Sequence, residues 1–121
     1  MEYTKLGNTD LEVSKICIGC MSFGKAGTMH DWTLDETESE KVIKHALDLG
    51  INFFDTANCY SAGTSEEYLG KAIRNNIARD KVVIASKVYF NDGRLSKEAI
   101  AREIDGTLQR LETDYLDLYI I

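Results

Sequence analysis

An acid, a phenol and an amine follow short apolar runs of this sequence, and together they could form a proton-transfer site. Asp55 and Tyr60 come after the run that begins near Ile51, and Lys87 ends the run that begins near Val82. A tyrosine hydroxyl has a pKa of about 10 and is a weak acid near neutral pH. A nearby ammonium favours the phenolate, and a carboxylate keeps that ammonium charged. We therefore expect Tyr60 to donate a proton to a carbonyl oxygen, tuned by Lys87 and Asp55.

Four apolar runs alternate along the chain with three amphipathic segments of helical length. The runs begin near Ile16, Ile51, Val82 and Leu116, so their spacings are 35, 31 and 34 residues. Apolar residues recur every three or four positions over 37–49, 65–77 and 97–112, as in helices with one buried face. A βαβ unit takes roughly 30 or more residues. The alternation predicts an α/β fold with parallel strands and helical crossovers, preceded by a β-hairpin over residues 3–13.

Parallel strands bring their carboxyl ends to one edge of a sheet, where sites gather in α/β folds. We therefore expect Asp55, Tyr60 and Lys87 to lie close together at this edge. Each residue also has a plainer interpretation. Asp55 could cap the turn that follows it, Tyr60 could pack at the rim, and Lys87 could be a solvated charge. Three such residues near consecutive strand ends favour the site.

Helix starts are predicted from residues that can cap a first turn. Thr37 with Glu40, and Thr64 with Glu67, have the spacing of a capping box, in which each side chain bonds the other residue's amide. Ser96 is expected to cap the helix over 97–112.

Composition limits the class of protein. The 121 residues suffice for a single domain, and their net charge of −6, without a run of Lys or Arg, disfavours nucleic-acid or membrane-surface partners. The chain lacks the apolar segment of a signal peptide and has an odd number of cysteines, so a cytoplasmic location is expected. Cys17 and Cys20 have CxxC spacing, but they lie in a predicted strand and its exit, and no second pair exists. No metal site is therefore predicted.

Several motifs together identify a resemblance. They lie at 5–7 (KLG), 19–24 (GCMSFG), 46–57 (ALDLGINFFDTA) with Tyr60 following, 63–66 (GTSE), 86–87 (SK) and 114–119 (DYLDLY). In these motifs the chain resembles the N-terminal half of an aldo-keto reductase, nearest to the bacterial branch akin to the potassium-channel β-subunit-like reductases. The similarity covers essentially the whole sequence.

The resemblance implies a fold and a reaction. The fold would be the N-terminal half of a (β/α)8 TIM barrel, a single partial domain in which 1–14 form the hairpin and 15–121 the repeat units. The reaction would be reduction of an aldehyde or ketone by hydride transfer from NADPH, with Tyr60 as proton donor. Gly19, Cys20, Met21 and Asp55 would contact the nicotinamide end of the cofactor.

The resemblance also implies a fourth catalytic residue, a histidine that would occupy position 122. Neither His30 nor His45 matches that position, so the chain is expected to be truncated before it and to have little or no turnover. One alternative is a non-catalytic half-barrel that serves in assembly or regulation and self-associates through exposed sheet edges. Another, less favoured, is an enzyme in which Lys87 forms a Schiff base, because Asp55 would oppose loss of the lysine proton.

Overall fold

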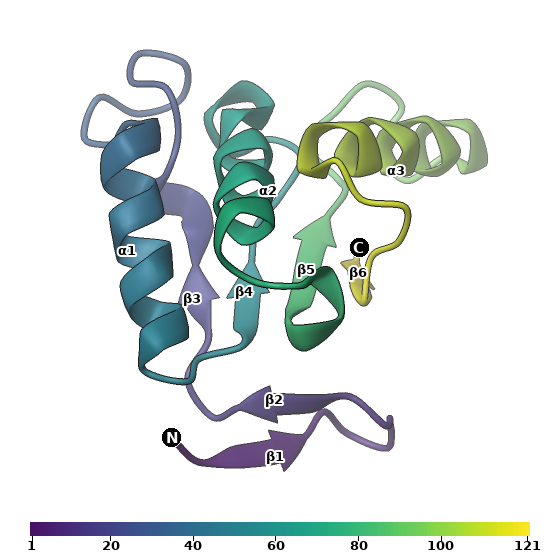
Figure 1. Ribbon diagram of the computed structural model, residues 1–121. Coiled ribbons are helices and arrows are strands. Elements are labelled where there is room, and N and C mark those ends of the chain that lie inside the picture. Colours follow the sequence, from purple (N-terminus) through teal and green to yellow (C-terminus); the bar gives the residue numbers. More distant parts are fainter.

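A four-stranded parallel sheet forms the centre of the molecule, and three helices lie against one of its faces (Figure 1). The computed structural model describes residues 1–121. The sheet order is β3 (Ile18–Gly19), β4 (Phe53–Asp55), β5 (Val83–Lys87) and β6 (Leu118–Ile120). The connections contain α1 (Glu36–Asp48), α2 (Thr64–Asn76) and α3 (Lys97–Leu111). The predicted alternation is confirmed, with each strand beginning one or two residues later than its apolar run.

Three short 3-10 helices complete the list of elements. They are η1 (Cys20–Ser22), η2 (Tyr60–Gly63) and η3 (Arg79–Lys81). None of the helices is long and apolar enough to span a membrane.

An antiparallel hairpin lies below the amino ends of the central strands (Figure 1). Its strands are β1 (Tyr3–Lys5) and β2 (Glu12–Ser14), as predicted. Asn52, just before β4, joins the hairpin to the sheet: its Oδ1 accepts from the Ser14 amide at 2.7 Å and its Nδ2 donates to the Glu12 carbonyl at 3.0 Å.

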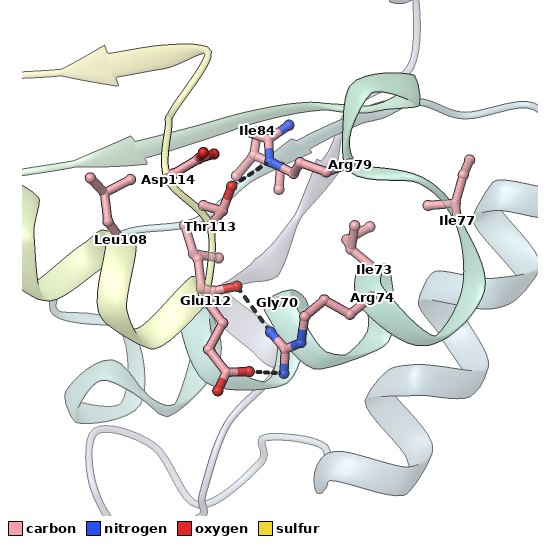
Figure 2. Close-up of a pocket in the computed structure, with 11 residues that line it drawn as sticks. Gly70, Ile73, Arg74, Ile77, Arg79, Ile84, Leu108, Glu112, Thr113 and Asp114 are labelled. Carbon is pink, nitrogen blue, oxygen red and sulfur yellow. Dashed lines mark hydrogen bonds and ion pairs between the residues drawn. The ribbon is translucent and has the colours of Figure 1, made fainter.

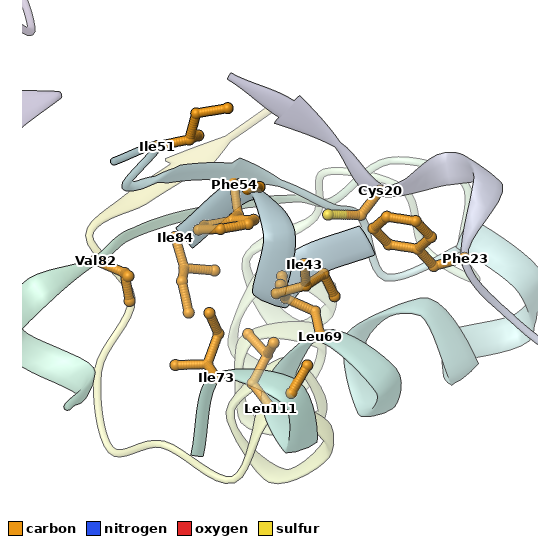
Figure 3. Packing of buried hydrophobic residues seen from close by; sticks show 12 residues of the cluster. Cys20, Phe23, Ile43, Ile51, Phe54, Leu69, Ile73, Val82, Ile84 and Leu111 are labelled. Carbon is orange, nitrogen blue, oxygen red and sulfur yellow. The ribbon is translucent and has the colours of Figure 1, made fainter. Parts of the chain in front are cut away.

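The core fills the space between the sheet and the helices (Figure 3). Phe54 of β4 and Ile84 of β5 are 0% and 1% exposed within a cluster that includes Ile43 of α1. Burial of side chains of this size stabilises a fold by roughly 1.5–3 kcal/mol each. Because successive strand residues point to opposite faces, Asp55 and Lys87 extend on the face away from the helices.

The helix starts confirm one predicted cap and correct another. Ser96 caps α3, since its Oγ accepts from the Ala99 amide at 3.2 Å. The capping box expected at Thr37 is wrong, because Asp35 caps α1 and its Oδ1 accepts from the Glu38 amide at 2.9 Å. A carboxylate two residues upstream is an equally good cap, and sequence spacing does not separate the two.

The start of α2 also differs from the capping box expected for Thr64 with Glu67. Gly63 is the N-cap, in a left-handed conformation and without a side-chain cap. The Thr64 hydroxyl instead donates to the Ser61 carbonyl at 2.7 Å and accepts from the Lys25 amide at 2.9 Å. It therefore secures neighbouring loops, which a local spacing rule does not detect.

Candidate active site

The Lys87 ammonium lies at the centre of the predicted site and contacts both predicted partners. Its Nζ donates to Asp55 Oδ2 at 2.6 Å and to the Tyr60 hydroxyl at 3.1 Å. A third bond, to the Thr56 carbonyl at 2.9 Å, was not predicted. The ammonium has three protons, so these contacts hold it in one orientation. The structure thus brings the acid, the phenol and the amine together.

The sheet places the acid and the amine. Asp55 is the last residue of β4 and Lys87 the last of β5, and the two strands are adjacent and parallel. Both side chains lie at the carboxyl edge and keep some contact with solvent, at 27% and 32% exposure. A group that enters this edge could therefore reach them.

A strained turn places the phenol. Tyr60 begins η2, whose next two residues, Ser61 and Ala62, have φ angles of 48° and 55°. Residues with a side chain seldom adopt this left-handed conformation, which costs roughly 1–2 kcal/mol each. Gly24 leaves space for the turn, because a Cβ there would lie 2.3 Å from the Ser61 Cβ. The turn that directs Tyr60 toward the edge of the sheet therefore lowers the stability of the fold.

Opposing influences set the charge of Lys87. Burial on its own lowers the pKa of the amine, but hydrogen bonds and charge interactions with Asp55 and Tyr60 outweigh it, so the pKa is raised. The amine is therefore held as an ammonium.

A mostly apolar pocket of about 160 Å³ adjoins the phenol and the amine. Tyr89 and Phe90, in the loop after β5, form part of its wall together with Ile120 of β6. Their rings stay substantially exposed, at 48% and 70%. Sequence reasoning missed these residues, although their position after a strand that ends in the site was a usable signal. The pocket has room for a small, mostly apolar group.

The residues expected to contact the nicotinamide end of a cofactor divide into two groups. Gly19 is exposed, pairs in register with Asp55, and has no atom within 4 Å of where a Cβ would lie. Met21 is 41% exposed. The Cys20 thiol is fully buried in the core, and the Cys20 carbonyl accepts from Ser65 Oγ at 2.7 Å. Burial raises the pKa of this thiol. The structure thus brings Gly19 and Asp55 together, whereas the Cys20 side chain points into the core and away from them.

The two histidines lie elsewhere. His45 is on the exposed side of α1, and His30 stacks on Trp32 with ring centroids 4.4 Å apart in the loop before α1. No group of three or more His, Cys, Asp or Glu side chains is arranged to hold a metal ion.

A larger cavity, of about 480 Å³, lies between α2 and α3 at the amino end of β5 (Figure 2). Its floor is apolar, but its guanidinium groups are already paired. Arg74 contacts the carboxylate of Glu112 and the Leu111 carbonyl, and Arg79 donates to Thr113 Oγ1 at 3.1 Å. The cavity is thus remote from Lys87, and its guanidinium groups are not free to bind a ligand.

Comparisons with known proteins identify the family of this chain. The model of the aldo/keto reductase family matches residues 15–121. Aldo-keto reductase YhdN from Bacillus subtilis is 42% identical over 125 residues, which cover 98% of this chain and 37% of YhdN. The holo form of aldo-keto reductase AKR11C1 from Bacillus halodurans superposes with a TM-score of 0.81 at 36% identity, over 99% of this chain and 40% of that one.

An aldo-keto reductase from Klebsiella pneumoniae, solved in complex with NADPH, superposes with a TM-score of 0.74 at 34% identity, over 89% of this chain and 34% of that one. The chain therefore belongs to the aldo/keto reductase family, an oxidoreductase family with the TIM-barrel fold. The α/β elements correspond to part of such a barrel, and the chain spans about two fifths of the length of these relatives.

Proposed function

We propose that this chain supplies the proton-transfer part of an NADPH-dependent carbonyl reductase, which converts an aldehyde or ketone to an alcohol. The observation that carries the proposal is the contact of the Lys87 ammonium with both Tyr60 and Asp55 beside an apolar pocket. Family membership supports the same reaction class.

The nicotinamide end of the cofactor fits the exposed strand ends. Gly19 and Asp55 lie side by side in register, and open space beside Gly19 would let a flat ring approach the backbone. Met21 could cover one side of it, whereas Cys20 could contribute only backbone atoms because its thiol is buried. Bound NADPH would supply a hydride to the carbonyl carbon.

The chain's own part is to supply a proton to the carbonyl oxygen. As negative charge develops on that oxygen, the Tyr60 hydroxyl donates its proton and becomes a phenolate. The ammonium of Lys87, 3.1 Å away, stabilises that phenolate, and Asp55 holds the ammonium in place. Because Lys87 is kept protonated, the arrangement counts against the Schiff-base alternative, which needs a neutral amine.

The fourth position of the family site, a histidine, has no counterpart among residues 1–121, since His30 and His45 lie elsewhere. We therefore expect residues 1–121 on their own to show little or no turnover. The proposal is tested in a chimaera that joins residues 1–121 to the remaining segment of YhdN, by following NADPH consumption with aldehydes and ketones.

In this chimaera, Tyr60→Phe should lower kcat by roughly 10²–10⁴-fold, the usual contribution of a general acid. The affinity for NADPH, measured by its fluorescence, should stay nearly constant, because phenylalanine keeps the aromatic ring of residue 60. Normal kcat in a folded Tyr60→Phe chimaera would rule out Tyr60 as proton donor.

A second proposal concerns residues 1–121 as an isolated polypeptide, which could serve in assembly or regulation instead of catalysis. The outer edges of β3 and β6 each lack a neighbouring strand, and Ile16 and Ile121 beside them are 54% and 74% exposed. Such edges pair readily with other chains, so self-association is expected. Light scattering tests this, and a monodisperse monomer at high concentration would contradict it.

A further inference from the structure

Glu66, in the first turn of α2, is a fully buried carboxylate that the proposed reaction does not use. Its Oε1 accepts from Arg110 Nε of α3 at 2.8 Å, and its Oε2 accepts from Ser86 Oγ of β5 at 2.9 Å. A buried charge is tolerated only when it is paired and hydrogen-bonded. Each carboxylate oxygen thus bonds a different element, and the side chain joins α2, α3 and β5.

The bond to Ser86 acts directly behind the amine of the site. Ser86 and Lys87 are consecutive residues of β5, so their side chains point to opposite faces of the sheet. Ser86 is fully buried against the helices, and Lys87 extends toward Asp55. The bond from Ser86 to Glu66 therefore also restrains the end of β5, from which Lys87 extends.

The bond to Arg110 acts on the turn that carries the phenol. The Arg110 side chain lies against Gly63, where an added Cβ would come within 2.7 Å of Arg110 Cδ. Gly63 ends η2, the strained turn that Tyr60 begins. The Glu66–Arg110 pair therefore holds the end of this turn against α3.

The two residues before Glu66 fix the same helical turn to other segments. Thr64 Oγ1 donates to the carbonyl of Ser61 at 2.7 Å, and Ser65 Oγ lies 3.2 Å from Thr56 Oγ1. Neither side chain forms a hydrogen bond with β5. Among the residues of this turn, Glu66 alone connects the start of α2 to the strand that carries Lys87.

We propose that Glu66 is a positioning residue, which keeps the Tyr60 hydroxyl within hydrogen-bond reach of the Lys87 ammonium by joining the turn of one to the strand of the other. It acts through Ser86 and Arg110 and touches neither substrate nor cofactor. Its catalytic meaning rests on the proposed function, but the geometry it maintains is measurable without turnover.

The test uses the 121-residue chain and the nuclear Overhauser contact between the Tyr60 ring protons and the Lys87 ε-methylene protons. This contact is expected in the wild type, because Lys87 Nζ lies 4.8 Å from the ring centroid. Glu66→Gln, which leaves Arg110 without its counter-charge, should lose the contact while amide signals of α1 and the hairpin persist. A folded Glu66→Gln chain that keeps the contact would overturn the proposal.

Two further variants keep the result decisive. Ser86→Ala removes only the hydroxyl and should also lose the contact; if Glu66→Gln does not fold, this variant decides alone, and retention of the contact in it overturns the proposal. Ile43→Val loosens the core beneath α1, away from the network, and should keep the contact. Loss of the contact in Ile43→Val would mean that general loosening explains the effect and would overturn the proposal.

Rescue by a conservative change separates positioning from simple support. Arg110→Lys keeps a cation next to Glu66 and should retain the contact, whereas Arg110→Met should lose it. Equal spectra for these two variants would count against the proposal. If the wild-type chimaera consumed no NADPH, the proposed function would fail, but the positioning of Tyr60 by Glu66 would still be judged by these spectra alone.

Discussion

At the amino end of the sheet Arg79 pairs with Asp117, and at the carboxyl end Lys87 pairs with Asp55, at 2.7 Å and 2.6 Å. The Arg79 guanidinium also donates hydrogen bonds to two backbone carbonyls and a threonine hydroxyl. Lys87 instead places one of its bonds on the hydroxyl of Tyr60 beside an open pocket. The two ion pairs are of similar length but differ in their further partners: Arg79 bonds backbone carbonyls and a threonine hydroxyl, whereas Lys87 bonds one backbone carbonyl and a phenol that can give a proton.

The largest expected effect is on turnover. In the chimaera with YhdN, Lys87→Met should lower kcat by roughly 10²–10⁴-fold, because the phenolate formed after proton transfer loses its stabilising cation. NADPH consumption measures this, with Lys41→Met, an exposed lysine on α1, as the matched control. Ordinary turnover in a folded Lys87→Met chimaera would remove the distinction between the two ends.

At the amino end the expected effect is on stability. Arg79→Met leaves the Asp117 carboxylate, 11% exposed, without its cation, and should lower the free energy of unfolding by about 2–4 kcal/mol, slightly below the roughly 3–5 kcal/mol of fully buried pairs. Urea denaturation measures this. Lys44→Met, which breaks an exposed pair with Asp48, should change stability by less than about 0.5 kcal/mol. Equal losses in the two variants would show that Arg79 is an ordinary surface ion.

The Asp35 carboxylate at the start of α1 is expected to be purely structural. Asp35→Ala removes the cap of α1 and should reduce stability by about 1 kcal/mol, while turnover of the chimaera stays the same. Thr37→Ala should change neither quantity noticeably. If Thr37→Ala proved the more destabilising of the two, the cap would lie where the sequence first placed it.

The smallest effect concerns strain. Ala62 and Glu112 have nearly equal left-handed φ angles of 55° and 52°, one in the Tyr60 turn and one at the end of α3. Glycine should stabilise position 62 by about 0.5 kcal/mol, since relief of roughly 1–2 kcal/mol is partly offset by chain entropy of roughly 0.5–1 kcal/mol. The gain at position 112 should be smaller, because glycine there also removes the exposed ion pair of Glu112 with Arg74. Thermal unfolding measures this gain.

The two glycine variants should differ in turnover. Ala62→Gly should lower kcat of the chimaera because Tyr60 becomes less well oriented, and Glu112→Gly should leave kcat unchanged. Identical activities would indicate that the strain in η2 has no part in orienting the phenol.

Periodic features of the sequence were predictable. The spacing of apolar runs located the strands to within two residues, and strand ends located Asp55 and Lys87, because both depend on a repeat that local sequence carries. Ser96 was recognised as a cap because capping depends on the residues next to the helix start.

Features that depend on contacts between distant segments were not predictable. Asp35 and Thr37 are both residue types that can cap a helix, and only the fold shows that Asp35 does so. The left-handed Ser61 and Ala62 carry no glycine signal, and Gly24, which makes room for them, lies far away in the chain. The sequence does not indicate that Glu66 is buried, because its burial depends on contacts with α3 and β5.

The adjacency of Ser86 and Lys87 on β5 has a consequence for mutation. Deletion or insertion of one residue in this strand would exchange the two side chains between faces. The ammonium would then be driven among the helices, and the hydroxyl would be left in the pocket. Because side chains alternate between the two faces of the strand, a one-residue shift in register here would disrupt folding and the site together. A variant with such a shift is therefore not expected to be a stable but inactive protein.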